Sequence, residues 1–91
     1  MTEEIQLINN NYNPAEAIEM LGNLIQHKMT FLSHKTLRDK EMFGSSDKQT
    51  EKRIEELSVL KQQLINSLKN LDSKTILQIN GQISIAIIDQ H

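Results

Sequence analysis

The stretch that decides the fold is Thr75-Ile-Leu-Gln-Ile-Asn-Gly-Gln-Ile-Ser-Ile-Ala-Ile-Ile-Asp89, near the carboxyl end of a 91-residue chain. From Leu77 to Ile87 every second residue is isoleucine, leucine or glycine, and the residues between them are polar or small. Side chains of an extended strand alternate between two faces, so this spacing predicts a strand with one apolar and one polar face. We place this strand at about residues 75–88.

The pair Asn80-Gly81 leaves three arrangements open for this segment. An unbroken strand, with Gly81 at a bulge or bend, preserves the alternation. A hairpin with a three-residue loop over residues 80–82 preserves it as well, because Ile79 would then face Ile83. A two-residue loop at Asn80-Gly81 would mix apolar and polar residues on each face. We therefore favour the unbroken strand and consider the two-residue loop the weakest of the three.

Local signals place three further elements. An apolar run followed by three asparagines predicts a short first strand at about residues 4–8. Asn13 and Pro14 suit the start of a helix and Gly44 suits its end, so the first helix is expected at about residues 14–42. A helix ending near Thr36, followed by a polar loop, is the alternative.

The second helix is expected at about residues 47–71. Ser46 and Gln49 have the spacing of a capping box at its start. Apolar residues then recur along it at helical spacing. The link between the two helices is so short that they must form an antiparallel helical hairpin.

The expected fold is therefore α+β, a single domain over residues 1–91 with strand, helix, helix and strand in that order. A long antiparallel helical hairpin packs on a small antiparallel sheet. The strand at 75–88 is much longer than the strand at 4–8, so most of its backbone groups would lack a partner. A second copy pairing about a two-fold axis would satisfy them, which predicts a homodimer. The predicted interface residues are Ile79, Gly81, Ile83, Ile85, Ile87 and Val59.

Composition limits the classes of protein to which the chain belongs. There is no cysteine, the formal net charge is −2, and no apolar run is long enough to span a membrane. The amino terminus is acidic where a secretory signal would be basic. We expect a soluble cytoplasmic protein that does not associate with a membrane.

No motif predicts catalysis, a cofactor or a metal. His27 and His34 are seven residues apart on the first helix, too far to share one ion. Lys28 and Lys61 fall at the same level of the two helices, and we expect both ammonium groups to reach solvent rather than to form a catalytic pair. We expect no enzyme activity and no cofactor.

Basic residues gather near the turn between the helices. A nucleic-acid-associated regulator that uses them is the alternative function, although acidic residues are interleaved and nucleic acid is therefore an improbable partner. Asp39 and Arg53 are expected to form an ion pair across the helices. The six basic residues are Lys35, Arg38, Lys40, Lys48, Lys52 and Arg53.

Three motifs resemble those of short uncharacterised bacterial proteins of this length. They are Tyr12-Asn-Pro-Ala-Glu-Ala17, Glu41-Met-Phe-Gly44 and Arg53-Ile-Glu-Glu-Leu57. Their residues are helix caps and core positions, so the resemblance implies a bacterial origin but no activity and no site.

The function that these observations predict is a non-enzymatic protein-interaction or assembly module, dimeric through its carboxy-terminal strand. A further protein partner is compatible with the same strand. An enzyme or ligand-binding protein with its site at the dimer interface is a third hypothesis.

Overall fold

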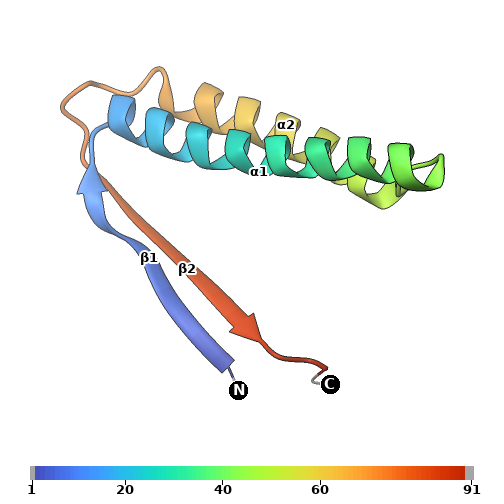
Figure 1. Ribbon diagram of the computed structural model, residues 1–91. Coiled ribbons are helices and arrows are strands. Elements are labelled where there is room, and N and C mark those ends of the chain that lie inside the picture. Colours follow the sequence, from blue (N-terminus) through green and yellow to red (C-terminus); the bar gives the residue numbers. More distant parts are fainter. Residues whose placement is uncertain (1, 90–91) are drawn as a thin grey trace.

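The computed structural model describes residues 2–89 and shows an antiparallel helical hairpin joined to a two-stranded antiparallel sheet (Figure 1). The β-α-α-β order and the α+β class predicted from the sequence are confirmed. The elements are β1 (Thr2–Tyr12), α1 (Pro14–Phe43), α2 (Lys48–Leu68) and β2 (Leu77–Ala86).

The ends of α1 follow from local hydrogen bonding. Asn13 Oδ1 accepts a hydrogen bond from the Glu16 amide at 2.8 Å, and the Asn13 amide donates to Glu16 Oε1 at 3.0 Å, which together form a capping box. Gly44 adopts the left-handed conformation at φ 78° and its amide donates to the Lys40 carbonyl. The helix thus runs to residue 43, and the alternative end near Thr36 is wrong.

The start of α2 differs from the predicted capping box. Asp47 is the N-cap and accepts a hydrogen bond from the Gln49 amide at 2.9 Å, whereas Ser46 donates its hydroxyl proton to Glu51. A carboxylate at the N-cap also suits the positive end of the helix. The helix ends at Leu68, three residues before the predicted end.

The first strand is longer than predicted. It covers residues 2–12 rather than 4–8, and Asn9, Asn10 and Asn11 pair with β2 opposite Asn80, Ile79 and Gln78. Paired backbone groups in a ladder outweigh the local preference of asparagine for turns. The predicted excess of unpaired groups on the long strand is therefore absent on the side that faces β1.

β2 is one unbroken strand, as favoured above, and the irregularity lies opposite Gly81 on the other strand. Gln6 pairs with Gln82 and Ile8 with Gly81, so Leu7 is an extra residue in β1. A Cβ atom at position 81 would lie 3.3 Å from Ile8 Cδ1. The glycine therefore leaves room for Ile8, and the bulge directs both Leu7 and Ile8 to one face.

The two hairpins diverge instead of packing along their length (Figure 1). They are joined at one end, and both chain termini lie at the far end of the strands. The radius of gyration is 16.7 Å, against about 12 Å for a compact domain of this length. The sheet consequently lies against the helices only near the junction.

Little of the described chain is buried. Ile8, Pro14, Ala17 and Leu57 are buried, and no large side chain is completely covered within residues 2–89. A single copy of the chain therefore has almost no hydrophobic core, although its sequence is rich in isoleucine and leucine.

Candidate interaction surface

One face of the sheet is apolar, which we call the apolar sheet face. The register places Ile83 opposite Ile5 and Ile85 opposite Glu3, and alternation puts Ile79 on the same side. Ile5, Ile83 and Ile85 each keep more than two fifths of their area exposed. Except where it meets the helices, this face is open to solvent.

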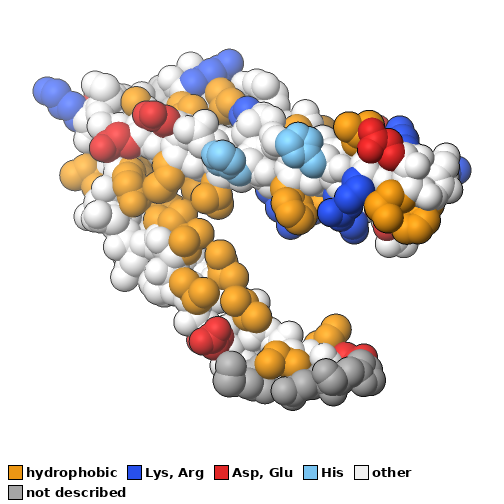
Figure 2. All heavy atoms as spheres, viewed as in Figure 1, with side chains coloured by type: hydrophobic (Ala, Val, Ile, Leu, Met, Phe, Trp, Pro, Cys, Tyr) orange, Lys and Arg blue, Asp and Glu red, His pale blue; other side chains and the backbone are white. Residues whose placement is uncertain are grey.

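The apolar sheet face and the helices form the two walls of an open hollow, which we call the notch. Its volume is about 480 Å³. Figure 2 shows apolar side chains along the inner side of both arms, turned toward the space between them. The lining residues are Leu7, Leu24, Ile25, His27, Lys28, Leu57 and Ile83.

Of the six predicted interface residues, the structure brings four together on the sheet. Ile79, Ile83 and Ile85 share the apolar face, and Gly81 lies beneath Ile8. The fifth, Ile87, is half exposed and follows the last residue of β2. The sequence reasoning did not name the helical leucines of the notch, Leu24 and Leu57, as interface residues, because it assigned both to the apolar stripes of their helices.

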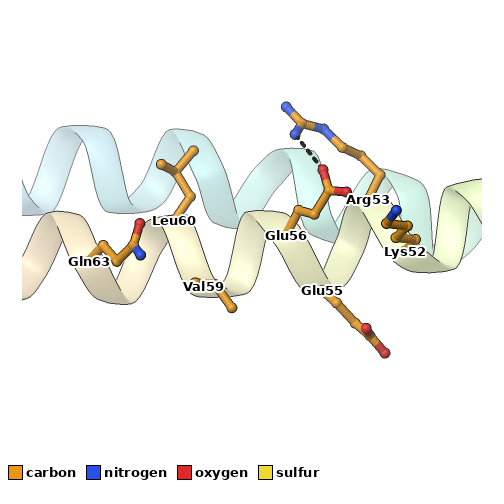
Figure 3. A pocket seen from close by; sticks show the side chains of 7 residues that line it. All are labelled: Lys52, Arg53, Glu55, Glu56, Val59, Leu60 and Gln63. Carbon is orange, nitrogen blue, oxygen red and sulfur yellow. Dashed lines mark hydrogen bonds and ion pairs between the residues drawn. The ribbon is translucent and has the colours of Figure 1, made fainter.

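Val59, the sixth residue, lies at a separate place. It is 56% exposed and lines a second hollow of about 440 Å³ on α2. Figure 3 shows Val59 and Glu55 pointing away from α1, with Lys52 beside them and Arg53 bonded to Glu56. Four of the seven residues that line this hollow are charged, with both signs, whereas the notch has one lysine among its seven.

The accessible area of the chain is larger than that of a compact monomer. The chain exposes 7306 Å², whereas a folded monomer of 10.5 kDa exposes about 5,400 Å². The excess of roughly 1,900 Å² per chain lies in the range that each subunit buries in an obligate dimer.

Two of the six basic residues near the helical turn pair with carboxylates. Lys40 Nζ lies 3.6 Å from Glu51 Oε1, and Arg53 pairs with Glu56 on its own helix at 3.2 Å. The predicted ion pair of Arg53 with Asp39 is not among the ion pairs of residues 2–89. The cations nearest the helical turn are thus partly neutralised by carboxylates.

The pKa of Glu51 is lowered from its ordinary value, chiefly by the hydrogen bond that Ser46 donates at 2.6 Å and further by the charge of Lys40. Because the pKa of Glu51 is lowered by folding, its ionised carboxylate stabilises the folded chain at neutral pH. This contribution to the free energy of unfolding is lost as the pH falls through the folded-state pKa.

We expect Ser46→Ala to raise the pKa of Glu51 toward its ordinary value, because the largest cause of the shift is removed. Titration of the side-chain carboxyl carbon by NMR measures this directly. Ser45→Ala is the control, since Ser45 is exposed and is not among the residues that shift the pKa of Glu51. An unchanged pKa in the Ser46 variant would contradict the assignment.

The other candidate groups are placed as ordinary surface residues. Lys28 Nζ lies 5.9 Å from the centre of the Phe31 ring, and Lys61 donates to Gln26 Oε1 at 3.0 Å. Among residues 2–89, no group of three histidine or acidic side chains is arranged to hold a metal ion. Neither described helix is long and apolar enough to cross a membrane.

Comparisons with protein-family models, with curated proteins and with solved structures found no match to this chain.

Proposed function

We propose that this chain is a non-enzymatic assembly module that works as a homodimer, formed through the sheet and the notch. The observation that carries the proposal is an accessible area well above that of a compact monomer, in a chain whose notch has apolar side chains on both walls. Burying apolar area is the main driving force of association, and a monomer rarely keeps apolar faces of this size in water.

The hairpin supplies a second argument. A two-stranded hairpin alone is at best marginally stable in water, and it needs a third strand or a packed helix. Here the distal half of the hairpin, residues 2–6 and 82–86, has neither within its own chain. A second copy can supply both.

Both outer edges of the described two-stranded sheet are open, but the edge of β2 is better suited to pairing, because β1 carries the bulge and both glutamates of the sheet. β1 occupies one edge of β2, and the sheet has two strands, so the other edge of β2 is open. Antiparallel pairing of two β2 edges about a two-fold axis would form a four-stranded sheet with both apolar faces on one side. In this proposal β2 forms the dimer interface, as the sequence predicted for the carboxy-terminal strand, but it does so through the edge that faces away from β1.

We expect the purified chain to have twice the mass of 10.5 kDa by light scattering coupled to size exclusion. Its sedimentation should remain that of a dimer down to micromolar concentration, because an obligate interface of this size binds tightly. A mass of one chain across that concentration range would refute the proposal.

A further inference from the structure

The wall of the notch formed by α1 combines apolar and basic side chains. Leu24 and Lys28 line the notch, and spacings of three and four residues place Phe31, Lys35 and Arg38 on the same face. Leu24 and Phe31 are 47% and 64% exposed. This face therefore suits an apolar partner that also carries negative charge.

The distal hairpin has that chemistry. Glu3 and Glu4 are the only charged residues of β1 and β2, so the described strands carry no positive side chain. Glu3 lies opposite Ile85 on the apolar sheet face, whereas Glu4 lies opposite Ser84 on the polar face. Apolar side chains with a carboxylate at the edge thus complement the face of α1.

The hairpin of the same chain is held away from that face. One residue, Asn13, separates β1 from α1, and its backbone and side chain are both bonded to Glu16. Pro14 is buried beside it. Closing the two arms within one chain would require rotation at this junction, which the capping box opposes.

We infer that the distal hairpin of a second copy occupies the α1 face of the notch, with Glu3 directed at Lys28, Lys35 and Arg38 of the other chain. The inference rests on the proposed dimer and names its contact surface. Pairing of two β2 edges supports the inference. In an antiparallel pair, the distal end of one hairpin lies beside the proximal end of the partner hairpin, where the partner's helices begin.

The absence of cysteine allows a direct test. Two chains with different tags, one carrying Ile85→Cys and the other Leu24→Cys, are mixed, equilibrated and oxidised. A mixed disulfide joins two chains by construction, and we expect at least about fivefold more of it than with Ser84→Cys in place of Ile85→Cys. Ser84 lies on the opposite face of the same strand and serves as the matched control.

The outcomes separate this inference from the proposed function. A dimer by light scattering with equal mixed disulfide from Ile85→Cys and Ser84→Cys would overturn the inference alone. A chain that carries both Ile85→Cys and Leu24→Cys tests the contact within one molecule. If it forms the intramolecular disulfide at the same yield when diluted, the α1 face contacts the hairpin of its own chain. A monomer at every concentration would overturn both proposals.

A charge test examines the same contact without cysteine. Glu3→Lys is expected to raise the dissociation constant of the dimer about tenfold at low ionic strength, with the effect fading as salt screens it. Glu4→Lys makes the same change of charge on the polar face and should alter the constant less than about twofold. Equal effects of the two variants, measured by sedimentation, would contradict the placement of Glu3.

Discussion

Ile85→Lys is expected to abolish dimer formation, with loss of at least about 3 kcal/mol of association free energy, or a hundredfold in the dissociation constant. Ile85 is 46% exposed in a single copy, so the free-energy cost of replacing it must come from lost contacts with the partner. A lysine there would bring an ammonium group into an apolar contact with no carboxylate of the second chain placed to receive it.

In an isolated chain the same substitution would be harmless. Position 85 lies opposite Glu3, and a cross-strand pair of opposite charges contributes about 0.2–1 kcal/mol in favour of the hairpin. The variant therefore distinguishes the two states of the molecule: it is damaging in a dimer and neutral in a monomer. Analytical ultracentrifugation and circular dichroism at matched concentrations measure association and folding separately.

Ser84→Lys is the matched control for this prediction. It places the same side chain one residue away, on the polar face and opposite Glu4. Association and helical signal should both remain as in the parent chain. If both variants were tolerated equally, the apolar sheet face would have no partner, and the proposed dimer would fail.

The helices were predictable because their ends are set by neighbouring residues. Asn13 with Glu16 begins α1, and Gly44 ends it, through hydrogen bonds that span four residues or fewer. At the start of α2 the predicted capping box of Ser46 and Gln49 is wrong, because the Ser46 hydroxyl bonds Glu51 and the adjacent Asp47 is the N-cap.

The first strand was mispredicted because its pairing is not local. Asn10 and Asn11 favour turns on their own, yet they remain extended opposite Ile79 and Gln78, almost seventy residues away in sequence. The adjacent pair Leu7-Ile8 interrupts the alternation of β1, and this signal indicates a bulge. This signal would have allowed the full length of β1 to be predicted from the sequence.

The candidate surface was predictable only on its sheet side. Alternation identifies Ile79, Ile83 and Ile85 without knowledge of the fold. The helical wall depends on the angle between the two hairpins, which the capping geometry at Asn13 sets in three dimensions and which no periodicity encodes. Val59 was selected from the sequence because it lies opposite the apolar stripe of the second helix, whereas Leu57, which lines the notch, belongs to that stripe.

Leu57→Ala is expected to be the most damaging truncation in the helices, lowering the free energy of unfolding by about 2–4 kcal/mol. Leu57 is 5% exposed and lines the notch from the middle of α2. Because few apolar residues are buried in the described chain, neighbouring side chains cannot readily refill the space that the truncation leaves. Urea denaturation followed by circular dichroism measures the loss.

Leu37→Ala is the matched control, since it removes the same atoms from a side chain that is 57% exposed on α1. Its effect should stay within about 0.5 kcal/mol. The midpoint of thermal unfolding should fall by about 10 °C or more for Leu57→Ala and by only a few degrees for Leu37→Ala. Similar losses in both variants would show that the burial of Leu57 does not govern stability, and that the helices are held by contacts elsewhere along α1.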